Sequence, residues 1–349
     1  MTHNEYPPAP LPTLESGVPP NVEQFNPHEE KGAYEEQQRP KTETAKYGFL
    51  GGPQNAYFGV SAMLGFRERF SLCYFIVFGG ALVGFCLFGV VMMIPSNVET
   101  ETVPGEWYWY RQPLFKKCIF VHIYLNIIAG VFAVFQFIPM IRRRKIILHR
   151  INGYFVLSTL LPAVITGSVV ARRAFGGDIS TQAAFYTLGS IIGFAAFKGI
   201  SNVRTTKIHR KWMLRTVTYT ASTLTARIIT SIARPIISIS SAYFSTWSCD
   251  EVSFLLKSSS LAASMFPVCA LSPGDDPKNV YVLVRASVNE DPINFGSAQR
   301  VTFGMALWLA MMIHAAGVEI YILATESYQW PVHSLEAVDQ HSSETSSKA

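Results

Sequence analysis

The chain alternates between long apolar runs and short polar or basic stretches. A helix needs about 20 predominantly apolar residues to cross the roughly 30 Å hydrocarbon core of a bilayer, and six runs come close to that length or exceed it. They lie at 70–94, 118–141, 151–171, 183–200, 212–232 and 301–324. We therefore predict an all-α polytopic transmembrane helix bundle with about six spans. Two shorter or Ser-rich stretches, 235–247 and 252–271, leave a seventh span open.

Both ends of the chain are polar. Residues 1–64 are rich in Pro, Glu and Asn, and residues 326–349 include a Ser-rich stretch. Segments of this composition bury too little apolar surface to fold. We expect two disordered tails around a transmembrane domain at 65–325. Within it, a long loop at 248–300 precedes the last span, and 280–288 could form a short strand there.

Composition and charge also favour a membrane protein. Hydrophobic residues make up 49% of the chain and charged residues only 15%, against about 25% charged residues in soluble domains. Basic residues gather in two loops, at 142–150 and 204–211. Because positive loops stay in the cytosol, we expect these loops and both tails to be cytosolic in a six-span protein. The expected location is the membrane of the endoplasmic reticulum. Arg172 and Arg173 lie on the opposite side, against this rule. The net charge of +5 is thus an orientation signal, and no nucleic-acid partner is expected.

The five cysteines show neither a CxxC pair nor the spacing of metal ligands, so we expect no metal site. Cys249 and Cys269 both fall in the expected non-cytosolic region. The sequence leaves open whether these two form a disulfide.

Polar side chains inside spans are costly and are therefore candidate functional residues. His122 and Asn126 are four residues apart in the second span, so they share one helical face. They could contact substrate, and His122 could also donate a proton or ligate haem. The alternative is a structural histidine that donates a hydrogen bond to a backbone carbonyl of a neighbouring helix.

A polar stripe in the fifth span contains Arg227, Thr220 and Thr223 at helical spacing. Since lipid does not tolerate such a stripe, it must face the interior of the bundle. It could bind an anion or an oxygenated substrate. Alternatively, Arg227 could pair with a carboxylate such as Glu319.

Two acidic residues are candidate proton donors. Glu319 lies in the last span, where a buried carboxyl without a cation would have a raised pKa and could act as a general acid; a structural pair with an arginine is the alternative. His314, another candidate for substrate binding, lies on a different face of the same helix. Glu106 stands beside the aromatic stretch 107–110 at the non-cytosolic mouth. Its aromatic neighbours could shelter a cation or could form an ordinary interfacial belt.

Two His-Arg pairs precede apolar runs on the cytosolic side. His149 and His209 lie at similar depth, where they could bind lipid headgroups through their arginine neighbours or clamp a haem iron. The strings HRINGY at 149–154 and HRKWMLR at 209–215 also carry a resemblance. Together with Thr225-Ala226-Arg227 and Val318-Glu319, they resemble an uncharacterised family of multi-pass membrane proteins found in bacteria and filamentous fungi.

This family resemblance spans roughly 70–325 and implies a helical membrane architecture with little defined chemistry. The segment 248–300 departs from the compact pattern expected of the family. In type, the chain also resembles fungal integral-membrane terpene cyclases, which protonate a prenyl epoxide with a carboxylic acid.

That second resemblance implies a cofactor-free cyclase or isomerase of fungal meroterpenoid biosynthesis, acting on a lipophilic prenylated substrate. The alternatives are a b-type haem protein that transfers electrons through pairs among His122, His149, His209 and His314, and a non-enzymatic protein that binds membrane lipids.

Overall fold

The computed structural model describes residues 53–66, 70–94, 97–272 and 274–327. The chain divides into two units, Met1–Phe58 and Gly59–Ala349. Of the first unit only the beginning of α2 (Pro53–Leu64) is described. The remaining description concerns the second unit.

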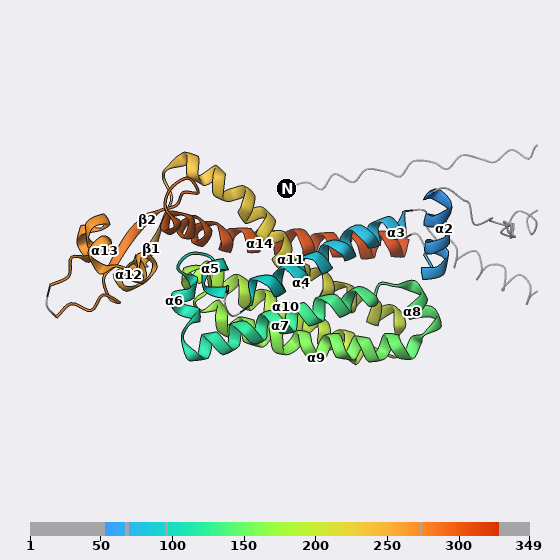
Figure 1. Cartoon of the computed structure of the whole chain (residues 1–349). Coiled ribbons are helices and arrows are strands. Elements are labelled where there is room, and N and C mark those ends of the chain that lie inside the picture. Colours follow the sequence, from blue (N-terminus) through green and yellow to red (C-terminus); the bar gives the residue numbers. More distant parts are fainter. Residues whose placement is uncertain (1–52, 67–69, 95–96, 273, 328–349) are drawn as a thin grey trace, which may run out of the picture. The chain divides into compact units, whose positions relative to one another are not determined.

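Five helices in the described part of the chain are long and apolar enough to cross a membrane (Figure 1). The first is a continuous helix over Ser71–Met92, in which α3 (Ser71–Tyr74), η1 (Phe75–Gly79) and α4 (Gly80–Met92) follow one another. The others are α7 (Pro113–Phe135), α9 (Ile146–Ala171), α10 (Ile179–Ser201) and α14 (Pro292–Ser327). The predicted all-α polytopic bundle is confirmed.

The sixth predicted span, 212–232, lies within α11 (Thr206–Ser240), a helix of 35 residues. α11 is long enough to cross a bilayer but is not among the five apolar helices, because its threonines and arginines lower its hydropathy. It packs along α10 and α14, and its Ala226 is fully buried. Neither candidate for a seventh span forms a separate long helix: 235–247 ends α11 and begins a strand, and 252–271 holds only short helices.

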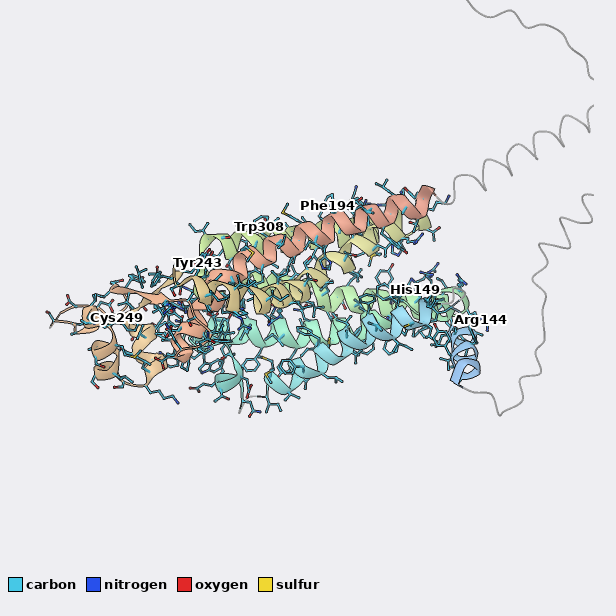
Figure 2. All side chains as sticks on the ribbon, turned by 90° about the horizontal axis from the view of Figure 1, so that it is seen from above. Arg144, His149, Phe194, Tyr243, Cys249 and Trp308 are labelled. Carbon is cyan, nitrogen blue, oxygen red and sulfur yellow. A yellow bond between two sulfur atoms is a disulfide. The ribbon has the colours of Figure 1, made fainter. Side chains whose placement is uncertain are left out.

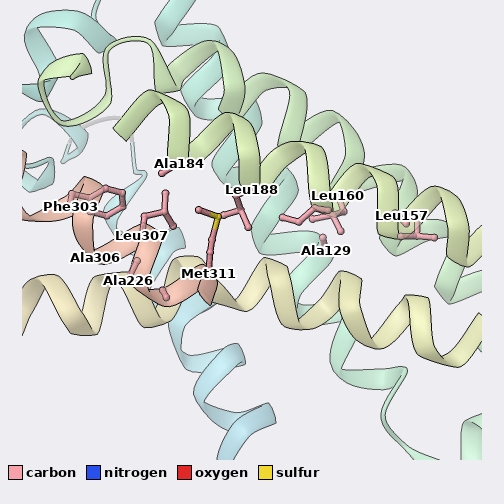
Figure 3. Close-up of a cluster of buried hydrophobic side chains, with 13 residues drawn as sticks. Ala129, Leu157, Leu160, Ala184, Leu188, Ala226, Phe303, Ala306, Leu307 and Met311 are labelled. Carbon is pink, nitrogen blue, oxygen red and sulfur yellow. The ribbon is translucent and has the colours of Figure 1, made fainter. Parts of the chain in front are cut away.

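The core of the bundle is built from small and medium-sized side chains of five helices (Figure 3). Fully buried alanines in α10, α11 and α14 let these helices approach closely, as small residues do in membrane bundles. The labelled members are Ala129, Leu157, Leu160, Ala184, Leu188, Ala226, Phe303, Ala306, Leu307 and Met311. α11 therefore belongs to the bundle despite its polar sequence.

The segment between α11 and α14, expected as a loop at 248–300, is folded; we call it the cap. Strands β1 (Phe244–Ser248) and β2 (Tyr281–Arg285) pair antiparallel, with Thr246 opposite Leu283. Helices α12 (Cys249–Leu256) and α13 (Ser259–Met265) and the short η3 (Pro267–Cys269) pack around fully buried Trp247. A disulfide joins Cys249 to Cys269, which answers the question that the sequence left open. The expected strand at 280–288 is β2, and the last membrane helix already begins at Pro292.

The bundle has two chemically different ends. The basic end contains α8 (Pro139–Arg144) and the turn before α11, while the opposite end contains α5 (Val98–Glu101), α6 (Glu106–Tyr110), η2 (Ala174–Gly177) and the cap. In Figure 2, Arg144 and His149 lie at the end opposite Cys249. Both predicted basic loops thus share one end of the bundle.

Candidate functional site

Glu106 is the most deeply buried acid at the cap end, with 1% of its surface exposed. It opens α6 directly after Gly105, whose φ of +90° suits glycine and where a Cβ would overlap the Trp247 ring of the cap. The Tyr110 hydroxyl donates to Glu106 Oε2 at 3.1 Å, and the Phe175 backbone N–H donates to the same oxygen at 2.7 Å. Glu106 Oε1 accepts no hydrogen bond from the described residues.

A second buried acid, Glu251, shares one cation with Glu106. Arg300 of α14 donates from Nη2 to Glu251 Oε1 at 3.2 Å, and its Nε lies 3.8 Å from Glu106 Oε1. Glu251 Oε2 also accepts from the Ser248 backbone N–H at 3.1 Å and completes the capping box of α12. The Arg300 guanidinium stacks 3.5 Å from the Trp247 ring centre. We call Glu106, Glu251 and Arg300 the acid cluster.

The charges of the acid cluster do not balance, because two carboxyls share one guanidinium. Burial raises the pKa of Glu106 above its usual value even though Arg300 and the hydrogen bonds from Phe175 and Tyr110 lower it. The pKa of Tyr110 is raised as well, by burial and by the neighbouring Glu106. Oε2 already accepts two hydrogen bonds, which leaves Oε1 as the oxygen that would carry a proton. Burial thus favours the protonated form of Glu106, and Oε1 has no hydrogen-bond partner among the described residues.

Aromatic residues of the stretch 107–110 bond to the cap instead of forming a free interfacial belt. Tyr108 donates to Asp250 Oδ2 at 2.5 Å, and Trp109 donates from Nε1 to Glu251 Oε1 at 2.5 Å. Burial and the hydrogen bond to Asp250 raise the pKa of Tyr108. Three consecutive aromatic residues, including Tyr110, therefore bond to three different carboxyl groups.

Arg227 of α11 lies toward the same end of the bundle as Tyr110. Its charge acts on both Tyr110 and His122, and its guanidinium lies 5.7 Å from the centre of the Phe85 ring. The side chain is exposed. Among the described residues, no carboxylate pairs with it and no group hydrogen-bonds to its guanidinium. The expected pair between Arg227 and Glu319 is not formed.

His122 and Asn126 are held by backbone groups. His122 Nδ1 lies 2.7 Å from the Ala163 carbonyl oxygen of α9, which accepts the hydrogen bond, and Asn126 Nδ2 donates to the His122 carbonyl at 2.7 Å. Gly167 makes room for the imidazole, since a Cβ there would stand 2.5 Å from the ring. At Nδ1, His122 is thus a structural histidine that donates a hydrogen bond to the backbone of a neighbouring helix. Its Nε2 lies 3.4 Å from Asn126 Nδ2.

The threonines of the predicted stripe use their hydroxyls within α11. Thr220 donates to the Thr216 carbonyl at 2.8 Å, and Thr223 donates to the Thr220 carbonyl at 3.1 Å. His314 Nε2 lies 2.7 Å from Thr225 Oγ1 and joins α14 to α11. These residues line or connect helices without meeting the acid cluster.

Glu319 lies in a bidentate ion pair. Arg215 donates from Nε to Oε1 at 2.6 Å and from Nη2 to Oε2 at 2.7 Å. Both oxygens are engaged and 46% of the side chain is exposed, which is the environment of an ionised carboxylate. The alternative of a structural pair with an arginine therefore describes Glu319, and Glu106 is the better candidate acid.

His149 and His209 lie close enough for their charges to interact. His209 Nδ1 lies 2.7 Å from the accepting Gly199 carbonyl at the end of α10, whereas His149 Nδ1 is buried without a hydrogen-bond partner among the described residues. In the first motif, Asn152 donates to the Phe132 carbonyl at 3.0 Å. Both motifs fasten the ends of adjacent helices.

Sequence reasoning missed Arg300 and Glu251, because both fell in the expected loop. The spacing of Ser248 and Glu251 is that of a capping box, and this signal could have revealed a helix there. Within the described residues, no group of three His, Cys, Asp or Glu side chains could hold a metal ion.

Comparison with known proteins agrees with a membrane protein. The sequence model of the family described as "Predicted membrane protein (DUF2306)" matches residues 119–249, which include both His-Arg motifs and Arg227 but neither Glu106 nor Arg300. The "Ava biosynthesis cluster protein G" of Aspergillus versicolor is 21% identical over 312 residues, covering 75% of this chain and 90% of that protein. No solved structure matches the chain. The chain is thus a multi-pass membrane protein with a distant relative in a fungal biosynthesis cluster.

Proposed function

We propose that this protein is a cofactor-free integral membrane enzyme of the terpene cyclase type, in which Glu106 protonates an epoxide or alkene of a lipophilic prenylated substrate. The observation that carries the proposal is the state of Glu106: a fully buried carboxyl with one oxygen that lacks a hydrogen-bond partner. Burial raises its pKa, which favours the protonated form that a general acid requires. The biosynthesis-cluster relative supports a role in secondary metabolism.

In the proposed reaction, the proton on Glu106 Oε1 passes to the epoxide oxygen while the carbon–oxygen bond breaks to leave a carbocation. An alkene of the same molecule then attacks this carbon, a carbon–carbon bond forms, and loss of a proton from the final cation gives an isomer of the substrate. The aromatic rings of Tyr110 and Phe85 near Arg227 are suited to a cationic intermediate, because ring faces attract positive charge.

The topology that goes with this proposal places the acid outside the cytosol. The basic end would face the cytosol, and the disulfide of the cap fits the oxidising lumen of the endoplasmic reticulum. The substrate would then reach the site from the membrane, and Arg227 would hold its oxygenated head.

The test is expression of the full chain in yeast microsomes that lack related activities, supplied with prenyl-epoxide substrates and assayed for cyclised products. We expect Glu106→Gln to abolish product formation. The matched control is Glu319→Gln, which removes a carboxyl paired with Arg215 and should keep the product profile. Identical products from wild type and Glu106→Gln would refute the role of Glu106.

A b-type haem protein is the second candidate, favoured by the proximity of His149 and His209 and by the unpartnered His149 Nδ1. A Soret band in the purified protein that disappears in His149→Ala would support this function. It would also refute the cofactor-free proposal.

A further inference from the structure

We propose that Arg227 is the receptor for an oxyanion, a phosphate or carboxylate, at the head of an amphiphilic ligand whose apolar tail lies among the membrane helices. The proposal deepens the function proposed above, since it assigns a charge class to the substrate, and it rests on Arg227 being the head-binding residue of that site.

The first step of the argument concerns charge. An arginine side chain stays protonated in proteins, and an unpaired charge within a membrane helix is costly. Two other arginines of the second unit are compensated by carboxylates: Arg215 pairs with Glu319, and Arg300 pairs with Glu251 and approaches Glu106. Arg227 has no such partner among the described residues. An uncompensated cation at this position is what an anion-binding site requires.

The second step concerns the groups around the guanidinium. Tyr110, His122 and Phe85 lie near Arg227, and none of them carries a negative charge near neutral pH. The His122 ring is held by the Ala163 carbonyl at Nδ1 and lies 3.4 Å from Asn126 Nδ2 at Nε2, so it forms a fixed neutral wall beside the guanidinium. Arg227 is an exposed residue on the surface of its helix. The site thus offers a fork of donors beside a neutral wall of aromatic rings.

The third step concerns depth. From the expected beginning of the span at Trp212, Arg227 lies roughly 22 Å along the helix axis. In a hydrocarbon core of about 30 Å, this places the guanidinium roughly 8 Å below the surface at the cap end. That depth suits the head of a molecule that remains in the bilayer, rather than a free anion in water.

α4, which contributes Phe85, borders this region loosely. It packs mainly against α7, and its helix is the least buried of the five apolar helices. Phe85 itself is 39% exposed. The ligand can therefore approach Arg227 from the lipid between α4 and its neighbours, without passing through the cap.

The experiment measures equilibrium binding of radiolabelled farnesyl phosphate to the full chain in a non-ionic detergent, with farnesol as the uncharged analogue. We expect wild type to bind the phosphate at least 10-fold more tightly than farnesol. Arg227→Gln should weaken phosphate binding by about 10- to 100-fold, the range of one charge-assisted hydrogen-bonded contact. The affinity of Arg227→Lys for the phosphate should lie between those of wild type and Arg227→Gln. The matched control is the exposed Arg143→Gln, which should bind as wild type does.

Three outcomes would overturn the proposal: equal binding by wild type and Arg227→Gln, equal affinity for farnesol and farnesyl phosphate, or inorganic phosphate competing as well as the prenyl phosphate. The thermal midpoint of the ligand-free protein separates a receptor from a structural arginine. Removal of an unpaired charge should leave the midpoint of Arg227→Gln equal or higher, and a clear decrease would contradict the proposal.

Glu106→Gln separates this inference from the proposed reaction. It should bind farnesyl phosphate as wild type does while forming no product. If Glu106→Gln still forms product and Arg227→Gln loses binding, the anion site stands and the role of Glu106 fails. If Glu106→Gln forms no product but Arg227→Gln binds normally, the anion site fails.

Discussion

Replacement of Arg300 by Met tests the electrostatic account of the acid cluster. Arg300 is the cation that Glu251 and Glu106 share, with 4% of its side chain exposed. Removing one partner of a buried ion pair typically costs about 3–5 kcal/mol, because the other charge stays buried without compensation. Because burial favours the protonated form of Glu106, we expect most of this cost to fall on Glu251, which lies 3.2 Å from Arg300 Nη2. The change also removes the stacking on Trp247.

The measurement is thermal unfolding of the purified protein in detergent at neutral pH. A loss of about 3–5 kcal/mol corresponds to a decrease of roughly 6–10 °C in the unfolding midpoint for a domain of about 250 residues. The double variant Arg300→Met with Glu251→Gln removes the buried charge together with its partner. We expect it to recover more than half of the lost stability.

Two results would refute this reasoning. If the double variant unfolds at the same temperature as Arg300→Met, the loss comes from packing against Trp247 and not from an unpaired carboxylate. If Arg300→Met unfolds at the wild-type temperature, the acid cluster does not join the cap to the bundle.

Three further predictions concern single positions. Burial raises the pKa of Glu106 in the folded protein above the 4.5 of an exposed glutamate, so folding favours the protonated form. The free energy of unfolding should therefore fall as pH rises from about 4.5 through the raised pKa. Glu106→Gln should flatten this part of a plot of unfolding midpoint against pH. Cys249→Ser opens a bridge that spans 20 residues of chain, which should cost about 3 kcal/mol and make the cap sensitive to limited proteolysis; equal protease resistance would contradict this. Gly167→Ala places a Cβ 2.5 Å from the His122 ring and should cost about 1–3 kcal/mol, whereas Gly193→Ala, with nothing within 4 Å of the new Cβ, should leave the unfolding midpoint unchanged.

The architecture of the bundle could be predicted because hydropathy over about 20 residues responds to the bilayer itself and not to tertiary contacts. The expected spans therefore fall on the observed helices. The cap could not be predicted in this way, because its stability depends on a disulfide and on a core around Trp247. Its polar composition alone, without knowledge of these contacts, predicts a loop.

The candidate site was predictable only in part, for a physical reason. A single acid in a sequence shows its presence but not its partner. The partners differ: Arg215 lies beside Glu319, and the guanidinium of Arg300, shared with Glu251, lies beside Glu106. Glu319 was the more attractive residue in the sequence because it lies inside a span, yet burial is greater for Glu106 in a short helix outside one.

The polar character of α11 has a consequence for how the protein is made. A helix with several arginines and threonines gains little from leaving the translocation channel for lipid by itself, so α11 must be accompanied by a more apolar helix. α14 is synthesised only after the whole cap. When α11 emerges, α10 is therefore the neighbouring apolar helix with which it can insert. The hydrogen bond of His209 to the Gly199 carbonyl joins these two helices at their shared turn. The second His-Arg motif therefore sits where a helical hairpin must close for biogenesis to proceed, and its replacement is expected to lower membrane integration before it alters any chemistry.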